Sequence, residues 1–270
     1  MLFLFCCLIG VAKAESPAPE LTAVAGEGRV VLNWSDGTGT GVAFYTVYRK
    51  QGAGDPFQPV LRTEFSSYVD TGLIPSIDFS YAVTATDESG EVSALSNVVL
   101  IQPEGTFIGP EADAYVHGGS FKNSNFGSND VLLLKTDPAN ENFARESYLR
   151  FDLSSLTGTI GQAVLRLKVA SATANGDTHA VYAVADDGWS EPTLTWNNKP
   201  TAGSLLASAV SPPEDEWIEL DVTEQVINEL AGDQIFSTAM ISNGGELVRY
   251  HSREASDTGD RPQLTAVLMT

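Results

Sequence analysis

Short runs of alternating apolar and polar residues recur along most of the chain, separated by clusters of Gly, Asn, Asp and Pro. A period of two places successive side chains on opposite faces of a strand, so each run predicts a half-buried strand. In Tyr148–Leu153, for example, Leu149, Phe151 and Leu153 share the face that we expect to be buried. Arg29–Trp34 has the same pattern. Many short strands joined by turns are typical of β-sandwiches.

The beginning of the chain has the pattern of a secretory signal peptide at residues 1–14. Leu2–Val11 is apolar but too short to cross a bilayer, and the small-x-small triplet Ala12–Ala14 follows it. Cleavage before Glu15 would export the protein and remove Cys6 and Cys7, which leaves the mature chain without a thiol. We therefore expect a secreted or cell-surface protein. No membrane insertion is expected, because no later segment is long and apolar enough to cross a bilayer.

The chain is strongly acidic, since 35 Asp and Glu residues against 15 Lys and Arg residues give a formal net charge of −20. Such a charge repels nucleic acid, so we expect no nucleic-acid partner. A chain of 270 residues is long enough for about two domains. Residues 17–103 contain 4 basic and 10 acidic residues, and residues 104–270 contain 10 basic and 24 acidic residues. A local basic patch can therefore form in the second part.

One group of residues in the first part is characteristic of a known family. It comprises Trp34 on a strand, the pair Tyr48-Arg49, Tyr68–Leu73, Tyr81 with Val83–Ala85, Asp87, and Ser96-Asn97. With this set, residues 17–102 resemble a fibronectin type III domain, which implies a β-sandwich that serves as a spacer. Phe79 stands where such domains have their corner tyrosine. The hydroxyl tether of that corner must therefore be absent or replaced.

A second ordered set of motifs runs through the rest of the chain. It comprises Asp113–Val116, Asn125–Gly127, Val131–Lys135, Arg145–Leu153, Ala163–Val169, Gly188–Glu191, Leu194–Pro200, Trp217–Thr223, Ser252–Glu254 and Arg261–Val267. With this set, residues 106–270 resemble the disaggregatase-related repeat domain, also classed as carbohydrate-binding module family 96. The resemblance implies a jelly-roll-like β-sandwich of the kind attached to secreted polysaccharide-degrading enzymes. Characterised members bind alginate through a groove rich in Lys and Arg.

The expected fold class is therefore all-β, with two β-sandwich domains in tandem. The second domain is expected to contain one short helix at Glu224–Leu230, which is the one stretch of the chain with helical character. Thr223 precedes this stretch and is its expected N-cap.

Basic residues in loops and at strand ends are the main candidates for binding an acidic polysaccharide. Arg offers a planar fork of donors to a carboxylate, Lys offers a mobile ammonium, and a rigid scaffold displays its loops. Arg145 and Arg253 lie beside Glu146 and Glu254, so internal ion pairs compete with binding there. Aromatic residues with a polar edge can stack on a sugar ring, although packing explains them equally well. The candidate ligand-binding residues are Lys122, Lys135, Arg145, Arg150, Arg249, Tyr250, His251 and Arg253.

Several other charged and aromatic residues have structural explanations beside the functional one. Arg166 and Lys168 are expected to face outward from a strand, where they either contact uronates or pair with the acids of the sheet. Trp189 is expected at a turn, where a sugar platform is the alternative to packing. Trp196 is expected on a strand in the core of the second domain, and Trp34 in the core of the first.

No catalytic residues are expected. His117, His179 and His251 are isolated, and the chain has no His-Glu-x-x-His or Gly-x-Ser-x-Gly motif. Some pair of carboxylates lies at a suitable distance for glycoside hydrolysis in any chain this acidic, and no motif supports one here. Ca²⁺ could bind to oxygen ligands in loops, but the sequence localises no metal site. The loop carboxylates, which turn formation explains better, are Asp177, Asp186, Asp187, Asp257 and Asp260.

The expected function is the binding of an acidic, uronate-rich polysaccharide by a secreted protein that is not an enzyme. One alternative is a structural or adhesive protein of the cell surface or matrix. Another is an accessory subunit of a polysaccharide-degrading enzyme whose catalytic protein is encoded separately. A continuous basic patch would favour polysaccharide binding over the structural role.

Overall fold

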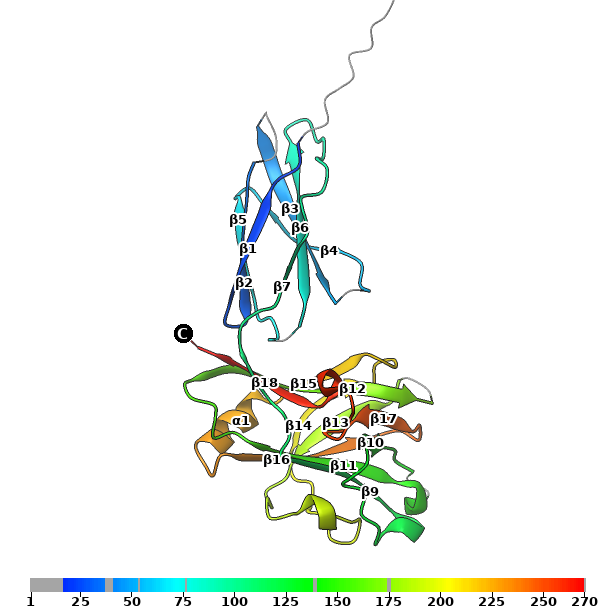
Figure 1. Cartoon of the computed structure of the whole chain (residues 1–270). Coiled ribbons are helices and arrows are strands. Elements are labelled where there is room, and N and C mark those ends of the chain that lie inside the picture. The colour runs from blue at the N-terminus through cyan, green and yellow to red at the C-terminus, as the bar shows by residue number, and fades with distance from the viewer. Residues whose placement is uncertain are drawn as a thin grey trace, which may run out of the picture. The chain divides into compact units, whose positions relative to one another are not determined.

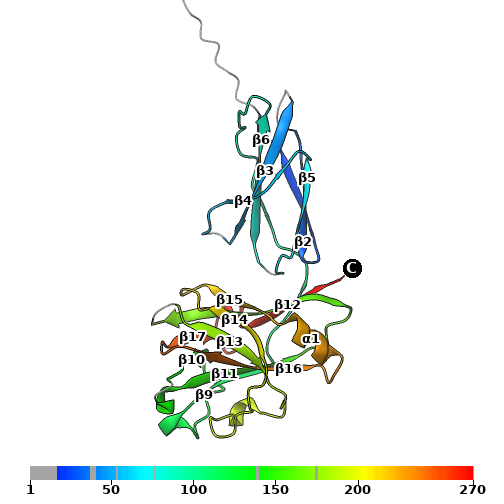
Figure 2. The same ribbon diagram turned by 180° about the vertical axis from the view of Figure 1, so that it is seen from behind.

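The computed structural model of the chain describes residues 17–36, 41–52, 54–75, 77–137, 140–173 and 176–269, without the side chain of Glu141. The predicted signal peptide lies outside these residues. The chain divides into two compact units, of which unit 1 contains Ile77–Pro103 and the residues up to Leu73, and unit 2 contains Ile74–Ser76 and Glu104–Thr270. Both are built almost entirely of strands (Figure 1, Figure 2). Among the described residues, no helix is long and apolar enough to cross a membrane.

Unit 1 is a sandwich of a three-stranded and a four-stranded antiparallel sheet. The strand order is β1-β2-β5 in the first sheet and β4-β3-β6-β7 in the second. The strands are β1 (Leu21–Gly26), β2 (Arg29–Trp34), β3 (Val42–Gln51), β4 (Gln58–Thr63), β5 (Ser67–Thr71), β6 (Phe79–Asp87) and β7 (Val99–Ile101).

The core of unit 1 follows the alternation of its strands. Val30 and Leu32 of β2 are fully buried and Trp34 is 6% exposed, so the predicted core position of Trp34 is confirmed. Its ring meets Tyr45 of β3 edge-on, at 5.5 Å between centroids.

A buried hydroxyl tether links β6 to β5. Tyr81 donates a hydrogen bond of 2.8 Å to Asp70 Oδ2, and Arg49 pairs with the same oxygen at 2.9 Å. Phe79 is buried two residues earlier, with the Arg49 guanidinium 5.7 Å from its ring. The tether thus comes from position 81, because the residue at position 79 has no hydroxyl group.

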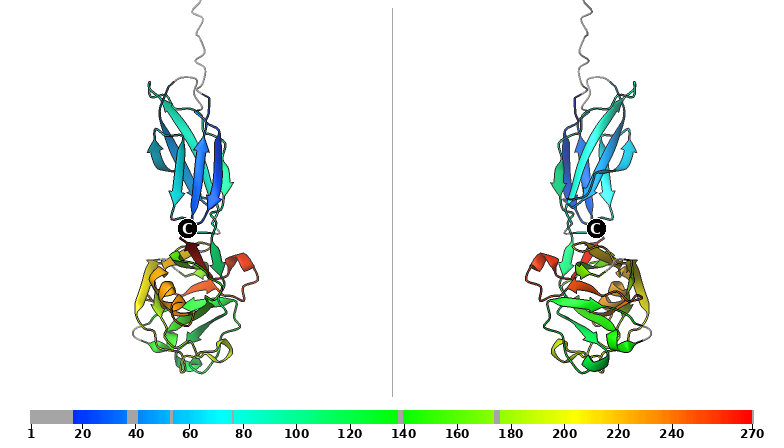
Figure 3. Two further views of the ribbon diagram at one scale, coloured as in Figure 1. Left: turned by 90° about the vertical axis from the view of Figure 1, so that its left-hand side faces the viewer. Right: turned by 90° about the vertical axis from the view of Figure 1, so that its right-hand side faces the viewer.

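Unit 2 is a sandwich of a five-stranded and a six-stranded antiparallel sheet (Figure 3). The five-stranded order is β14-β13-β16-β11-β9, and the six-stranded order is β10-β17-β12-β18-β8, with β15 also paired to β12. The strands are β8 (Thr106–Ile108), β9 (Ala112–His117), β10 (Val131–Leu134), β11 (Arg145–Asp152), β12 (Ile160–Ala172), β13 (Thr178–Ala183), β14 (Leu205–Val210), β15 (Trp217–Asp221), β16 (Ile235–Ser242), β17 (Val248–His251) and β18 (Gln263–Leu268). The helices are α1 (Thr223–Leu230) and the 3-10 turns η1 (Gly119–Phe121), η2 (Glu141–Phe143), η3 (Glu191–Thr193) and η4 (Thr258–Asp260).

The main core of unit 2 lies between these two sheets. Leu149 and Phe151 of β11 belong to the same buried cluster as Leu165 and Leu167 of β12, and none of the four is exposed. The ring of Phe151 lies 6.0 Å from that of Phe236 on the neighbouring strand β16. Burial of each such side chain stabilises the fold by roughly 1.5–3 kcal/mol.

A second, smaller core covers the outer face of the five-stranded sheet. It forms where segment 184–202 packs over β9, β11 and β16. Trp189 and Leu194 of this segment are buried, and the Trp189 ring meets Tyr148 of β11 edge-on at 6.3 Å. We call residues 184–202 the cover segment.

The all-β fold class expected from the sequence is confirmed. Two local predictions are wrong. Trp196 lies in turns that follow η3, because the cover segment crosses the sheet without joining it. Thr223 is the first residue of α1, with Val222 as the N-cap. Its hydroxyl bonds instead to Asp221 at 2.6 Å and accepts the backbone N–H of Ala163 at 2.9 Å, which fastens the helix to β12.

We expect a buried histidine to make the stability of unit 2 depend on pH. His179 of β13 is fully buried with Nδ1 2.7 Å from the Tyr250 hydroxyl, and burial lowers its pKa from 6.5 to about 4. Between about pH 6.5 and 4, His179 is therefore protonated in the unfolded chain but neutral in the folded chain. The contribution of His179 to the free energy of unfolding is fully present above pH 6.5. It is lost as the pH falls toward 4, which lowers the free energy of unfolding by up to about 3 kcal/mol. Urea unfolding at several pH values, followed by tryptophan fluorescence, should show a shallower dependence in His179→Gln. An unchanged dependence in the variant would contradict this role.

Candidate functional site

The basic residues of unit 2 fall into two groups. Arg150, Arg166, Lys168, Lys199 and Arg253 pair with Glu111, Glu219, Asp260, Glu146 and Glu191, respectively. The others make no ion pair with a carboxylate among the side chains that the structure describes. They are Lys122, Lys135, Arg145, Arg249 and Arg261. In a unit with a large excess of acids, a cation without a partner is unusual and therefore a candidate for binding.

Three of these unpaired cations lie on adjoining strands. Arg145 begins β11. Its backbone forms two hydrogen bonds with the backbone of Lys135, with N–O distances of 2.8 and 3.1 Å. Lys135 directly follows β10, and in that strand Leu133 lies opposite Arg249 of β17. Leu133 and Lys135 are two residues apart, so they lie on the same face of the strand as Arg249. We call Lys135, Arg145 and Arg249 the cation patch.

An aromatic wall adjoins the cation patch. His117 of β9 lies opposite Arg145, and Tyr115 lies two residues before it on the same face. The His117 ring stacks on Phe121 at 4.6 Å, and the Tyr115 ring stacks on Phe126 at 4.4 Å. We call Tyr115, His117, Phe121 and Phe126 the aromatic wall.

The rim of the aromatic wall is open to solvent. Phe121 of η1 and Phe143 of η2 are each 50% exposed. The two turns pack closely, because Gly119 has a φ of +62° and lies so near Asn142 that a Cβ atom would come within 2.3 Å of its side chain. The carbonyl of Asn142 lies 3.2 Å from His117 Nε2. The exposed rings are therefore held in place by a fixed backbone.

The electrostatics of the patch show cations that are not neutralised. Burial lowers the pKa of Arg145; nearby Tyr115 opposes this shift, and Arg249 lowers the pKa further by repulsion between like charges. Burial also lowers the pKa of His117, and Arg145 adds to that shift, so His117 is neutral at pH 7. Guanidinium and ammonium groups beside exposed rings can bind carboxylates while the rings stack on sugars.

Comparison with known families identifies the class of module. The model of carbohydrate-binding module family 96 matches residues 105–267, which is more than half of the chain. The chain belongs to carbohydrate-binding module family 96.

The relatives of this family 96 chain include parts of much larger proteins. A gellan lyase of Bacillus sp is 32% identical over 133 residues, which is 46% of this chain and 5% of that protein. An amylopullulanase of Thermoanaerobacter thermohydrosulfuricus is 35% identical over 91 residues, which is 33% of this chain and 6% of that protein. Among solved structures, the fibronectin type-III domain of human fibronectin type III domain containing protein 3 is 25% identical. The match covers 35% of this chain and 92% of that domain's chain, with a TM-score of 0.29.

Three of the expected ligand-binding residues in the family 96 module have partners within its own structure. Tyr250 is fully buried in the main core, so its prediction as a sugar-stacking residue is wrong. Arg150 pairs with Glu111 at 2.5 Å and donates to the carbonyls of Asp187 and Trp189. Arg253 pairs with Glu191 at 3.0 Å. In the two arginines, these internal bonds compete with a glycan for part of the guanidinium donors, and both residues stay predictions.

The other expected residues remain accessible. Lys122 is exposed at the end of η1, beside Phe121 of the aromatic wall. His251 of β17 is partly exposed, two residues from Arg249, and its Nε2 lies 3.8 Å from Asp260. Together with the cation patch, these two residues stay predictions. The sequence prediction missed the aromatic wall, for which Phe121, an apolar residue in a Gly/Ser/Asn-rich loop, was the available signal.

The strand cations and the tryptophans of unit 2 make contacts within the protein, as the structural explanation of these residues predicts. Arg166 is 4% exposed, paired with Glu219, with its guanidinium 4.4 Å from the Trp217 ring. Lys168 pairs with Asp260 at 2.7 Å. Trp189 is 7% exposed, so it offers no sugar platform. Trp196 is half-buried under Lys199, whose Nζ lies 3.6 Å from the ring centroid.

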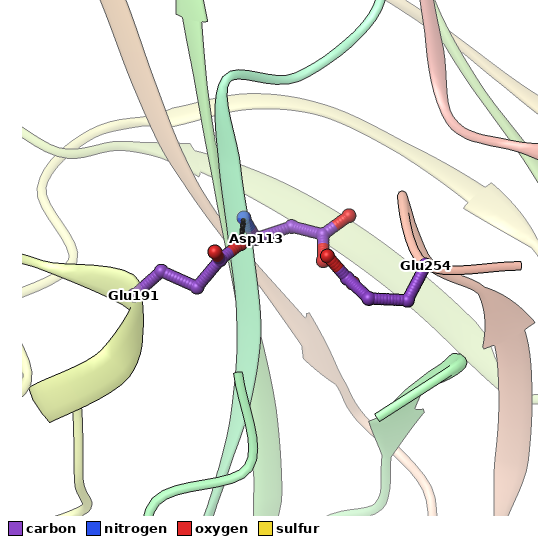
Figure 4. Close-up of side chains that lie close together, drawn as sticks. All are labelled: Asp113, Glu191 and Glu254. Carbon is purple, nitrogen blue, oxygen red and sulfur yellow. Dashed lines mark hydrogen bonds between the residues drawn. The ribbon is translucent and has the colours of Figure 1, made fainter. Parts of the chain in front are cut away.

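A cluster of carboxylates lies at one end of β9. Asp113, Glu191 and Glu254 come together there from β9, η3 and the segment after β17 (Figure 4). Burial raises the pKa of Asp113 well above its usual range. The loop carboxylates that the sequence suggested for Ca²⁺ lie elsewhere; Asp186 and Asp257, for instance, accept backbone N–H groups in their own turns. With its carboxylate 1% exposed, Asp113 is closed to a polymer substrate.

We expect the paired and unpaired arginines to differ in their effect on stability. Arg150→Met would leave Glu111 without its partner and two carbonyls without a donor, so the free energy of unfolding should fall by roughly 2 kcal/mol. Arg249→Met removes only a 3.5 Å contact with Ser171, so the free energy of unfolding should change by less than about 0.5 kcal/mol. Urea unfolding of both variants measures the difference. Equal losses would show that Arg249 also has a structural role.

Proposed function

We propose that unit 2 binds an acidic, uronate-rich polysaccharide without chemical conversion, and that the cation patch and aromatic wall form the binding surface. One observation supports this most strongly. Lys135, Arg145 and Arg249 lie on adjoining strands without a carboxylate partner among the described side chains, in a protein with a net charge of −20. Leaving three neighbouring cations unpaired is unfavourable for the folded chain alone and favourable when an anion binds.

The patch suits a polyuronate in two respects. A uronate residue carries one carboxylate beside a ring, and the surface places guanidinium and ammonium donors beside exposed Phe121. Arginine can bind a carboxylate with two parallel hydrogen bonds, which also fixes its orientation. The acidic remainder of the protein repels polyanions, so attraction is confined to the patch. We propose Lys122 and His251 as residues at its rim.

We further propose that the protein is exported, that unit 1 is a fibronectin type III domain, and that it acts as a spacer. Its strand orders β1-β2-β5 and β4-β3-β6-β7 and the motif residues Trp34, Arg49 and Tyr81 support the domain type. The apolar run at residues 2–11 supports export.

A second candidate function is that of an accessory subunit for a polysaccharide-degrading enzyme. The relatives named gellan lyase and amylopullulanase favour it, because the chain spans only 5% and 6% of them. Such an accessory role would use the same binding surface. It differs from independent binding in requiring a catalytic partner, which a separately encoded protein would supply.

Affinity electrophoresis of the full chain in gels that contain alginate, pectate, gellan or pullulan tests the proposed function. We expect alginate or pectate to retard the protein and salt to weaken the retardation. Arg145→Ala and Arg249→Ala should each weaken binding about 10-fold to 100-fold, which corresponds to the loss of one charge-assisted hydrogen bond. Phe121→Ala should also weaken polysaccharide binding, because it removes an exposed ring.

Arg29→Ala is the matched control, because Arg29 is exposed on unit 1 and its loss changes the net charge equally. It should migrate like the unsubstituted protein in every gel. Equal retardation of all variants would place the binding surface elsewhere. Absence of retardation by every polymer would exclude polysaccharide binding and favour the structural or adhesive role.

A further inference from the structure

The three carboxylates at the end of β9 form a compact oxygen cluster. Asp113, Glu191 and Glu254 each offer one oxygen, and these oxygens all lie within 4.8 Å of one another. In Figure 4 the Asp113 carboxylate points toward Glu254, and the backbone N–H of Asp113 donates to Glu191. Calcium ligands lie 2.3–2.6 Å from the ion, so two oxygens that share one ion are at most about 5 Å apart. The cluster therefore fits around a single ion.

Asp113 is the residue that the rest of the protein leaves unsatisfied. Its side chain is 1% exposed, and while Oδ2 accepts the backbone N–H of Arg253 at 2.8 Å, Oδ1 has no hydrogen-bond partner among the described residues. A carboxylate oxygen that is buried without a partner is costly. Asp113 contributes one of its carboxylate oxygens to the cluster, so a cation bound there would compensate this buried group.

The charges of the cluster are not balanced by the protein. Three carboxylates face one guanidinium, that of Arg253, whose Nη1 lies 3.0 and 3.2 Å from the two oxygens of Glu191. Its Nε is 3.9 Å from Glu254, too far for a hydrogen bond. Two of the three carboxyl groups therefore lack a hydrogen-bonded cationic partner within the cluster, and one divalent cation would provide it.

We infer that Asp113, Glu191 and Glu254 bind one Ca²⁺ ion. All three donors are carboxylate oxygens, which are the ligands of hard cations, and the cluster contains no sulfur or imidazole ligand of the kind that zinc prefers. Calcium accepts irregular carboxylate sites more readily than magnesium, which requires near-octahedral geometry and retains its waters. The site goes beyond the proposed function, since the ion binds with no polysaccharide present.

The ion joins three segments that are distant in the sequence. Asp113 lies on β9, Glu191 begins η3 in the cover segment, and Glu254 follows β17. Strands β9 and β17 also contribute Tyr115, His117 and Arg249 to the binding surface. Calcium thus acts as a clamp on the strands that carry that surface.

Calorimetric titration of the EDTA-treated full chain with CaCl₂, without any glycan, tests the site. We expect one bound Ca²⁺ per chain, and a rise in the Tm of unit 2 of about 5–10 °C at 100 times the Kd. MgCl₂ at the same concentration should raise it much less. Asp113→Asn and Glu254→Gln should each weaken calcium binding at least 10-fold.

Glu214→Gln is the matched control, because Glu214 is exposed in unit 2 and is not one of the three carboxylates of the cluster. It should bind calcium like the unsubstituted chain. Asp113→Asn also removes the buried charge, so in EDTA it should be at least as stable as the unsubstituted chain, which separates loss of the site from loss of the fold. Absence of calcium binding by the unsubstituted chain, or equal binding by Asp113→Asn, would overturn the inference. Polysaccharide binding can fail without affecting either result.

Discussion

The face-to-face burial of the two sheets of unit 2 is the interaction on which its other features depend. Leu149 and Phe151 on one sheet and Leu165 and Leu167 on the other exclude water from the interval between them. This packing fixes which side chains of each strand point inward. Arg249 alternates with the buried Val248 and Tyr250 of β17 and is thereby held outside the main core. Arg145 lies at the beginning of β11, beyond Leu149 on the same face. The proposed binding surface is therefore positioned by the core without contributing to it.

Strand alternation made much of this fold predictable. A period of two located β2, β11 and β12 and the faces that pack in the sandwich cores. It did not show that Tyr148 and Arg166, on the other faces, are buried as well. The cover segment escaped prediction, since Leu194 and Trp196 look like strand residues, but the one is buried and the other half-buried by packing across a sheet. Pairing between Arg150 and Glu111, 39 residues apart, depends on tertiary contacts that no local pattern encodes.

The candidate site was predictable only in part for the same reason. The sequence shows which residues are basic, but only the register of β9, β10, β11 and β17 shows that Lys135, Arg145 and Arg249 adjoin. Tyr250 looked like a surface aromatic beside His251, yet period two sends neighbours to opposite faces, and it is His251 that points outward. Asp113 was concealed because an acidic residue within a strand gives no local indication that two distant carboxylates will meet it.

The cover segment also limits how much of a long polymer the module can hold. Segment 184–202 packs over β9, β11 and β16, so that broad part of the outer sheet face is closed. The proposed binding surface lies around the ends of β9, β10 and β11, where Lys135, Arg145 and His117 adjoin. With three cations and four rings, this proposed surface would give only modest affinity by itself. Tight attachment to a polymer would then come from several such modules engaging the same strand, each raising the effective concentration of the next.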